Sequence, residues 1–406
     1  MKKVLILGAG LVSKPLIEYL LEKRIALLVA SPVKERADEM IGVDPLGKSV
    51  DWSMDDPLTL SRLISEHDVT VSLLPFRYHT EVAKLCIGSG RPLVTTSYVQ
   101  PDMMALDGEA REKGVSLLNE TGLYPGIDHM SAMKIINEVH DNGGSIEKFF
   151  SLCGALPAPE AAGNPFKYKF SWSPMGVILA SRNSALYLKD KQKIYIDPED
   201  LFRDRFACNF PGIGELEVYP NRDSISYIDI YGIPEVSTMY RGTFRYRGWC
   251  EILDVMKRLN MLDDKVISCK GKSYAEFFAE TAGTGTADLS TYIKTKLGIK
   301  VDSAPFKALE FLGFFSSEIM DNEEISPMEV TAGRMIELMT LGDNDRDMVA
   351  MQHIFLAGYP SGHREVIKSS MLDFGSPSAN TAIARTVALP AAIAARLILE
   401  NKLTLS

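Results

Sequence analysis

The stretch KVLILGAGLVSKP, residues 3–15, decides the fold of the first part of the chain. A short apolar run ends at Gly8, Gly10 follows two residues later, and Ser13 stands where a third glycine is usual. In a strand–turn–helix unit the first glycine permits a tight turn, and the second lets the backbone approach a pyrophosphate at the helix N-terminus. The pattern predicts a dinucleotide-binding turn, although a similar turn can join a strand to a helix without any ligand.

The residues after this turn alternate between apolar runs and amphipathic helical patterns. Further strands are expected at IALLVAS (25–31), SVDW (49–52), VTVSLLP (69–75), PLVTTS (92–97) and VSLLNE (115–120). Helical spacing separates them, as in LVSKPLIEYLLEKR (11–24) and MMALDGEAREKG (103–114). Six strands alternating with helices predict the α/β class, with a doubly wound, Rossmann-type parallel sheet covered on both faces.

From about residue 145 the rhythm changes to longer strand-like runs. They are IEKFFSLCGALPAPE (146–160), KYKFSW (167–172), GELEVYP (214–220), STMYRGTFRYRG (237–248), DMVAMQHIFLAG (347–358) and REVIKSSMLDFG (364–375). Helical patterns fill 250–264, 274–284 and 289–299, and a long one with an internal proline covers 380–401. We expect a dinucleotide-binding domain at 1–125, an α+β domain at 126–250 and 341–375, and a helical insert at 251–340. The C-terminal segment, 376–406, is expected to pack back on the first domain.

The composition fits an ordinary globular protein and excludes several classes. The 406 residues are 46% hydrophobic and 24% charged, and the formal net charge is −9, so a general basic surface for nucleic acid is not expected. The most apolar late stretch, VALPAAIAARLILE (387–400), is interrupted by Pro390 and Arg396, so no membrane span is expected. The start resembles a secretory signal but lacks a convincing cleavage site.

The cysteines indicate a reducing environment. Five of them occur, an odd number without a C-x-x-C pair: Cys86, Cys153, Cys208, Cys250 and Cys269. Free thiols in the cytoplasm are therefore expected, rather than a disulfide framework or a metal site.

The end of the second expected strand bears on the choice between NAD and NADP. NAD-specific sites usually carry Asp or Glu there to bind the ribose 2′-hydroxyl. This chain has Ala30, Ser31 and Pro32, followed by Lys34 and Arg36. Because no acid repels a 2′-phosphate, Ser31, Lys34 and Arg36 are candidate contacts for it. The two basic residues can equally be solvated helix residues, so the expected cofactor is NADP or NAD.

The segment NETGLYPGIDHM, residues 119–130, follows the sixth expected strand. Open parallel sheets bind ligands at the carboxyl ends of their strands, so this segment is expected near the cleft. Asp128 is expected to be the N-cap of the helix that follows, with a site role as the alternative. His129 and His79 are the histidines expected to titrate near neutral pH, although a lone histidine at a helix start is more often structural.

Three arginines gather in MYRGTFRYRGW, residues 239–249. If this stretch is a strand, Arg241, Thr243, Arg245 and Arg247 share one face, and Tyr240, Phe244 and Tyr246 take the other. From the pattern alone, a solvated strand face is the simpler interpretation.

Several motifs together resemble one family. They are TTSYVQP (95–101), GLYPGIDHM (122–130), LCGALPAPE (152–160), NPFKYKFSWSP (164–174), YPNRDS (219–224) and RGTFRYRG (241–248). The chain resembles, from residue 3 to about 400, the glutamate-forming saccharopine dehydrogenases. These are also called saccharopine reductases and include the second half of the bifunctional aminoadipate semialdehyde synthase.

The resemblance implies a Rossmann domain, an α/β substrate and dimerisation domain, and a helical domain, in a homodimer. It implies NAD(P)-dependent oxidation of saccharopine, a secondary amine with three carboxylates, to an imine that hydrolyses to glutamate and aminoadipate semialdehyde. By position, the nucleotide meets Gly8, Gly10, Leu11, Val12, Ser31, Leu74, Thr96 and Ser97. The substrate meets Ser97, Tyr98, Arg222, Thr243 and Arg245, and Tyr98 and Cys153 lie near the reacting amine. Arg222 and Arg245 then bind substrate carboxylates, which explains why an acidic protein carries arginines at these positions.

Two departures from the family bear on the substrate and the proton transfer. The family usually has Asp in GLDPG, where this chain has Tyr124, so Tyr124 joins the expected catalytic residues. Relatives are also expected to extend beyond residue 406, with an effect on the dimer or on a lid. Two alternatives stay open: another opine or a carboxyalkylated polyamine as substrate, and a nucleotide-binding homologue without catalysis. Arginines in the pocket argue against a polyamine.

Overall fold

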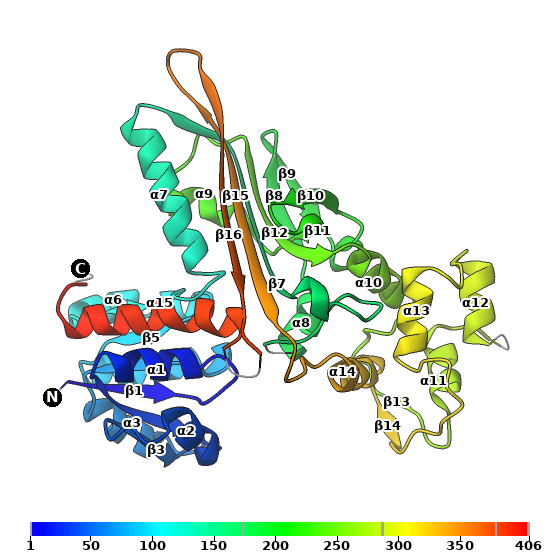
Figure 1. Ribbon diagram of the computed structural model, residues 1–406, viewed down its shortest axis with the longest axis horizontal. Helices are drawn as coiled ribbons and strands as arrows, with labels where there is room; N and C mark the ends of the chain where they lie inside the picture. Colours follow the sequence, from blue (N-terminus) through cyan, green and yellow to red (C-terminus); the bar gives the residue numbers. More distant parts are fainter. Residues whose placement is uncertain (1, 173, 286–287, 378–379, 404–406) are drawn as a thin grey trace. The chain divides into compact units, whose positions relative to one another are not determined.

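The computed structural model describes residues 2–172, 174–285, 288–377 and 380–403 (Figure 1). The chain divides into two compact units, and each is described by itself. The first unit comprises Met1–Lys134 and Ala379–Ser406, and the second comprises Ile135–Ser378. Residues 378–379 and 404–406 of the expected C-terminal segment lie outside the described residues.

The first unit contains the six-stranded parallel sheet that the sequence predicts. The strand order is β3-β2-β1-β4-β5-β6, and every neighbouring pair is parallel. The strands are β1 (Lys3–Leu7), β2 (Ala26–Ser31), β3 (Gly47–Asp51), β4 (Val69–Ser72), β5 (Leu93–Thr95) and β6 (Leu117–Leu118). The order reverses between β1 and β4, and doubly wound sheets bind their ligands at this switch point.

Apolar side chains of β1 alternate between two cores, one on each face of the sheet. Val4 and Ile6 belong to the core that contains α1 and the C-terminal helix, whereas Leu5 and Leu7 belong to the core under α3 and α4. The helices are α1 (Lys14–Glu22), α2 (Lys34–Ile41), α3 (Pro57–Ser65), α4 (His79–Gly88), α5 (Pro101–Met104), α6 (Asp107–Glu112) and α15 (Ala382–Leu399). A single 3₁₀ turn, η1 (Phe76–Tyr78), precedes α4.

One helix expectation in this unit is wrong. The pattern at 103–114 predicts a single helix, but the chain forms α5 and α6 with a break between them. The break spans Ala105 and Leu106, where the Leu106 amide donates to the Met103 carbonyl at 3.1 Å, a tighter i−3 bond that ends the regular α-helical pattern.

The C-terminal helix α15 packs along α1 and against β4 (Figure 1). By length and composition it is apolar enough to cross a membrane, with a mean hydropathy of 1.7. Of that helical window, 56% is buried inside the structure, as in the core helix of a globular protein. The helix is therefore weak evidence for a membrane span.

The second unit contains an eight-stranded mixed sheet. Its main order is β10-β11-β12-β7-β15-β16, with β8 pairing β12 and β9; β12 and β7 are parallel, and the other pairs are antiparallel. The strands are β7 (Ser145–Pro157), β8 (Ala185–Lys189), β9 (Gln192–Ile196), β10 (Phe206–Phe210), β11 (Gly214–Pro220), β12 (Thr238–Tyr246), β15 (Asp347–Gly358) and β16 (Arg364–Phe374). β16 forms one edge of this sheet.

Helices and a two-stranded ribbon complete the second unit. The α-helices are α7 (Ile127–Asp141), which begins in the first unit, α8 (Pro174–Ala180), α9 (Ser226–Tyr231), α10 (Trp249–Arg258), α11 (Tyr274–Thr281), α12 (Leu289–Lys296), α13 (Ala304–Phe311) and α14 (Pro327–Leu338). The ribbon pairs β13 (Ile267–Ser268) with β14 (Glu324–Ile325), and 3₁₀ turns lie at η2 (Pro159–Ala161) and η3 (Pro198–Asp200). The domain boundaries at 125, 250 and 340 remain predictions.

The expectation of a strand at KYKFSW is wrong. Phe166, Tyr168 and Phe170 are buried, so the alternation is real. The backbone instead turns at Lys167, whose φ is +49°, and the Asn164 amide donates to the Tyr168 carbonyl at 2.6 Å. Local hydrogen bonds from Asn164 thus replace a strand ladder.

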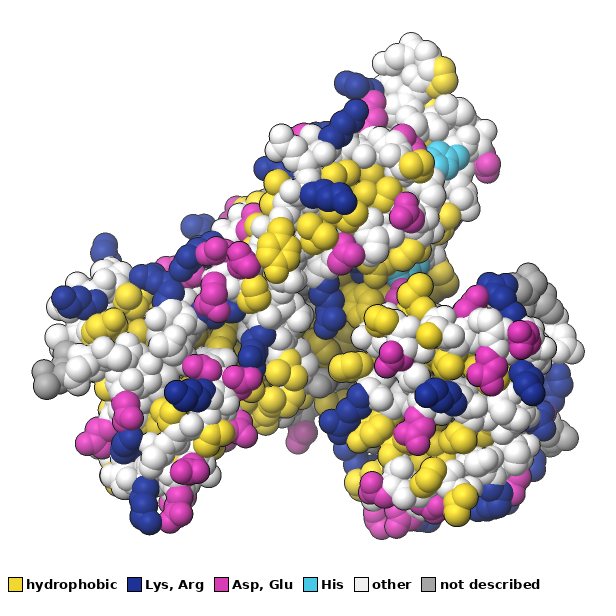
Figure 2. All heavy atoms as spheres, turned by 180° about the vertical axis from the view of Figure 1, so that it is seen from behind, with side chains coloured by type: hydrophobic (Ala, Val, Ile, Leu, Met, Phe, Trp, Pro, Cys, Tyr) yellow, Lys and Arg dark blue, Asp and Glu magenta, His cyan; other side chains and the backbone are white. Residues whose placement is uncertain are grey.

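Charges of both signs are interspersed on the molecular face that Figure 2 shows. Lys and Arg side chains on that face alternate with Asp, Glu and apolar side chains. Such mixing differs from the concentrated positive patch that nucleic-acid binding requires.

Candidate functional site

The glycine-rich turn after β1 has the shape of a pyrophosphate cradle. Gly8 has a φ of +103°, a conformation that a residue with a side chain rarely adopts. The buried Ser13 hydroxyl donates to the Gly8 carbonyl at 3.1 Å and accepts from the Gly10 amide at 3.0 Å, which fixes the turn. A Cβ built on Gly10 would meet no atom within 4 Å, so this position is open. The residues present therefore fit a bound dinucleotide.

Other predicted nucleotide contacts surround this turn. The Leu11 side chain is 57% exposed beside Gly10, and Val12 is half-buried. Leu74, which follows β4, reaches to 3.7 Å from a Cβ built on Gly8, so the carboxyl ends of β1 and β4 meet here. Ser31 is buried at the end of β2, where its hydroxyl accepts from the Val33 amide at 3.2 Å.

The two basic residues after β2 differ in their surroundings. The Lys34 ammonium donates to Asp38 at 2.6 Å, and this hydrogen bond lowers the pKa of the Asp38 carboxyl. Arg36 is exposed on the same short helix. Lys34 therefore already has an acidic partner, whereas the Arg36 guanidinium extends into solvent.

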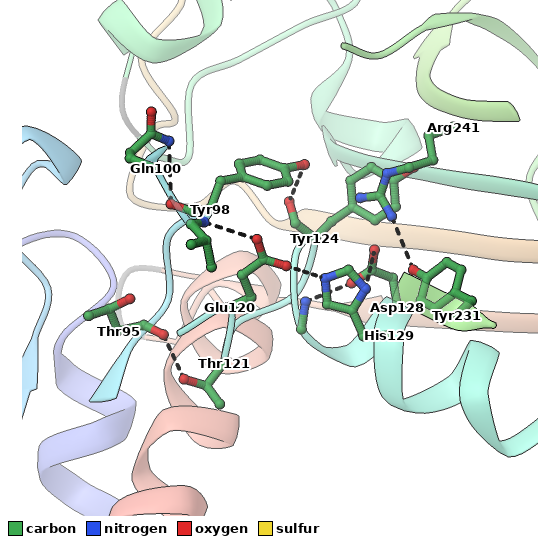
Figure 3. A network of polar contacts seen from close by, with 12 residues as sticks. Thr95, Tyr98, Gln100, Glu120, Thr121, Tyr124, Asp128, His129, Tyr231 and Arg241 are labelled. Carbon is green, nitrogen blue, oxygen red and sulfur yellow. Dashed lines mark hydrogen bonds and ion pairs between the residues drawn. The ribbon is translucent and has the colours of Figure 1, made fainter. Parts of the chain in front are cut away.

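The segment Thr96–Val99 follows β5, and side chains from three other places hold it. The His79 imidazole lies 3.0 Å from the Ser97 hydroxyl. The Tyr98 hydroxyl donates to the Tyr124 carbonyl at 3.3 Å, and the Val99 amide donates to Glu120 at 3.0 Å (Figure 3). Thr96 lies against Gly122, because a Cβ built on Gly122 would lie 3.2 Å from the Thr96 Cβ.

Glu120 is a residue of this network that the sequence did not single out. Its second carboxylate oxygen lies 2.7 Å from His129 Nε2, so it links α7 to the Tyr98 segment (Figure 3). Its φ is +56°, a further sign of a constrained position. Its place at the carboxyl end of the sixth strand, two residues beyond β6, is the signal that could have identified it.

Two expectations for this unit are wrong. Asp128 is not the N-cap of a helix, because α7 already begins at Ile127 and places Asp128 in its first turn. Its carboxylate is fully buried and accepts from the Gly126 amide at 2.6 Å. His79 does not titrate near neutral pH, because burial lowers its pKa to about 4.

In the second unit, β12 and β7 bring a predicted substrate contact, Thr243, and a predicted catalytic residue, Cys153, together. Thr243 pairs with Cys153 in the parallel register of these strands, and Cys153 is buried. Arg222 follows β11, is exposed and has a φ of +53°. The Arg222 carbonyl accepts from the Leu186 amide at 2.9 Å, which ties this turn to β8.

The arginine cluster does not form a solvated strand face. Arg241 is 1% exposed and Arg245 is 5% exposed, because both faces of β12 are covered. Arg241 lies 4.1 Å above the Tyr227 ring and donates to the Tyr231 hydroxyl at 3.4 Å (Figure 3). Arg247 lies beyond the end of β12 and is exposed, with Glu215 at 3.6 Å.

Arg245 lies among aromatic rings. Its guanidinium is 4.9 Å from the Tyr168 centroid, 5.3 Å from that of Trp249 and 5.9 Å from that of Tyr219. Its Nη1 donates to the Phe244 carbonyl at 2.8 Å, and its Nε has no hydrogen-bond partner among the described residues. Within that part of the chain, no carboxylate lies within 4.0 Å of it. A buried cation without a carboxylate partner is a good receptor for an anionic ligand.

The predicted site residues thus fall into two groups. The first unit holds every predicted nucleotide contact together with Tyr98 and Tyr124. The second unit holds Cys153, Arg222, Thr243 and Arg245. The described residues include no cluster of three or more His, Cys, Asp or Glu side chains that could hold a metal ion.

A parallel sheet of this order, with a glycine-rich turn at its switch point, defines a dinucleotide-binding protein of the Rossmann class. Family models described as "Saccharopine dehydrogenase NADP binding domain" and "Saccharopine dehydrogenase C-terminal domain" match residues 4–118 and 122–405. The chain belongs to the saccharopine dehydrogenase family.

Individual relatives cover nearly the whole chain. It is 36% identical to the saccharopine dehydrogenase [NADP(+), L-glutamate-forming] of Schizosaccharomyces pombe, over 99% of this chain and 92% of that protein. It is 34% identical to the mitochondrial alpha-aminoadipic semialdehyde synthase of Bos taurus, over 99% of this chain and 44% of that protein. The solved apo saccharopine dehydrogenase (L-Glu forming) of Saccharomyces cerevisiae matches with a TM-score of 0.90 and 35% identity, over 99% of this chain and 92% of that one.

Proposed function

We propose that this protein is an NADP-dependent saccharopine dehydrogenase that cleaves saccharopine to L-glutamate and 2-aminoadipate 6-semialdehyde. The observation that carries the proposal is Arg245, a guanidinium that is 5% exposed and has no carboxylate partner among the described residues. A substrate with three carboxylates supplies the missing anion. Full-length similarity to glutamate-forming enzymes supports the same conclusion.

The overall reaction balances as saccharopine, NADP⁺ and water giving glutamate, the semialdehyde, NADPH and a proton. When bound, the nucleotide would supply the hydride acceptor for the carbon next to the amine. Gly8, Gly10 and Leu11 would hold its phosphates, because the turn is open at Gly10 and fixed by Ser13.

The chain's own residues bind the substrate and move protons. Arg245 is proposed to grip one carboxylate with its fork of N–H groups, and the exposed Arg222 a second. The substrate amine must lose a proton before its carbon can release a hydride. The Tyr98 hydroxyl and the Cys153 thiol are proposed to carry protons there, with Thr243 beside Cys153 in the sheet.

NADP is the proposed cofactor rather than NAD. The end of β2 carries no acid, Ser31 is buried there, and Arg36 is exposed while Lys34 is bound to Asp38. Arg36 is therefore the proposed partner of the 2′-phosphate. Arg36→Ala should lower kcat/KM for NADP⁺ about tenfold and leave that for NAD⁺ unchanged. Equal loss with both cofactors would exclude this role.

We further propose a homodimer and a cytoplasmic location. β16 offers an edge strand of 11 residues, and an exposed edge of this length can pair with a second copy. The five cysteines are free thiols, which suits a reducing compartment. Light scattering on the purified protein would test the dimer, and a monomer mass at micromolar concentration would exclude it.

A panel of substrates tests the proposed activity. Saccharopine, other opines and carboxyalkylated polyamines are each supplied with NADP⁺, and reduction of the nucleotide is followed by absorbance. Saccharopine should give the highest kcat/KM. Higher kcat/KM with another opine would reassign the substrate, and nucleotide binding without any turnover would favour the non-catalytic alternative.

A further inference from the structure

His79 bridges two serine hydroxyls at the carboxyl ends of β4 and β5. Its Nδ1 lies 3.1 Å from the Ser72 hydroxyl oxygen, and its Nε2 lies 3.0 Å from the Ser97 hydroxyl oxygen. The imidazole is 4% exposed at the first residue of α4. All three residues belong to the first unit.

The imidazole is neutral, so one ring nitrogen donates and the other accepts. Burial lowers the pKa of His79 to about 4, and the ring therefore carries a single proton at neutral pH. The hydroxyl positions decide which nitrogen carries it. Either Ser72 donates to Nδ1 and Nε2–H donates to Ser97, or both bonds run in the opposite direction.

Ser72 decides between these two arrangements. Its side chain is fully buried, and Nδ1 of His79 is its only hydrogen-bond partner among the described residues. If Nδ1 carried the proton, the Ser72 O–H would be a buried donor without an acceptor, which is unfavourable. The favoured arrangement is Ser72 O–H to Nδ1, and Nε2–H to the Ser97 oxygen.

We propose that His79 is a positioning residue that sets the polarity of Ser97. Because Nε2–H donates to the Ser97 oxygen, the Ser97 hydroxyl proton is directed away from His79. Among the described residues, His79 is the only hydrogen-bond partner of the Ser97 hydroxyl. Ser97 therefore presents a hydrogen-bond donor to a ligand that carries an acceptor oxygen. That the ligand is the nucleotide or the substrate rests on the proposed function.

The tautomer can be measured without any assay of activity. Proton–nitrogen correlation spectra of protein labelled with ¹⁵N-histidine report which ring nitrogen is protonated, and His79→Gln assigns the signal. We expect His79 to show the Nε2–H form, unchanged between about pH 8 and about pH 5.5. His67 is a matched control in the same protein. Its Nδ1 lies 2.6 Å from the Leu63 carbonyl, so it must donate there and show the opposite tautomer. An Nδ1–H form or an imidazolium at His79 would overturn the proposal.

Ligand binding tests the consequence for Ser97. His79→Phe removes the donor, whereas His79→Gln keeps an amide N–H that can reach Ser97. We expect His79→Phe and Ser97→Ala each to weaken one ligand about tenfold, His79→Gln to restore most of the loss, and the double variant to be no weaker than Ser97→Ala. Losses that multiply in the double variant would contradict action through Ser97.

Two titrations identify the ligand that Ser97 contacts. NADPH fluorescence reports the nucleotide alone, and the KM for saccharopine reports the substrate. A loss in the first assigns a nucleotide oxygen, and a loss confined to the second assigns a carboxylate. If saccharopine is not turned over at all, the proposed function fails, while the tautomer and the NADPH titration still decide the role of His79.

Discussion

Replacing Arg245 with methionine should separate ligand binding from folding. The change removes a hydrogen bond to the Phe244 carbonyl, worth about 1.5–3 kcal/mol, and contacts with three aromatic rings, worth about 0.5–2 kcal/mol together. It also relieves the desolvation of a buried cation, which costs several kcal/mol. These effects oppose each other, so the free energy of unfolding should change by less than about 2 kcal/mol.

Substrate affinity should respond much more strongly. Losing a charged hydrogen bond to a carboxylate in a buried site costs about 2–5 kcal/mol, which raises the KM for saccharopine from about thirtyfold to several thousandfold. Arg245→Lys keeps the charge but loses the planar fork, so its KM for saccharopine should lie between those of the unchanged protein and Arg245→Met.

Kinetics and chemical denaturation on the same preparations measure both effects. Arg247→Ala is the matched control, because this neighbour is exposed and its only ion pair among the described residues is with Glu215, at 3.6 Å. Arg247→Ala should change neither the KM for saccharopine nor the free energy of unfolding. If Arg245→Met instead lost several kcal/mol of stability and kept its KM, Arg245 would be a structural residue and the carboxylate assignment would be wrong.

Three further outcomes are expected. Gly10→Val should fold normally, because a Cβ there meets nothing within 4 Å, yet NADPH affinity should fall at least a hundredfold by titration; unchanged affinity would move the nucleotide elsewhere. Tyr124→Asp should shift the acidic limb of kcat to higher pH, since a carboxylate stabilises the bound substrate ammonium and raises its pKa; an unchanged profile would make Tyr124 a bystander. Burial lowers the pKa of His79 from 6.5 to about 4, so the unfolded chain binds an extra proton in that range and stability is lost as the pH falls through it. Denaturation at several pH values should show that, as the pH falls, His79→Gln loses less free energy of unfolding than the unchanged protein, by up to about 3 kcal/mol. The same pH dependence of stability in both proteins would refute this.

The nucleotide end of the molecule was predictable because its signals are local. Gly8, Gly10 and Ser13 lie within six residues of one another, and the turn they form depends on their own backbone conformations. The parallel sheet was predictable for a related reason, since strands buried on both faces read as continuous apolar runs.

The surroundings of Arg245 were not predictable from its strand. Alternation in β12 separates its two faces but does not tell which face meets solvent, and both are buried here. Tyr168, Tyr219 and Trp249 reach the guanidinium from other segments. Only tertiary packing brings such side chains together.

A missed hairpin has a different cause. β8 and β9 are joined by Asp190 and Lys191, both at positive φ of 48° and 68°. Such two-residue turns are usually recognised by Asn-Gly or Asp-Gly. Because lysine occupies the second turn position, the turn does not match the usual pattern, and only the structure shows that β8 pairs with β9.

Product analysis of one reaction decides whether saccharopine is cleaved on the glutamate side. The purified protein is incubated with saccharopine and NADP⁺, and the products are identified by mass spectrometry while NADPH is quantified. We predict glutamate and 2-aminoadipate 6-semialdehyde in amounts equal to the NADPH formed. Lysine with 2-oxoglutarate, or no NADPH although the nucleotide binds, would contradict the proposed function.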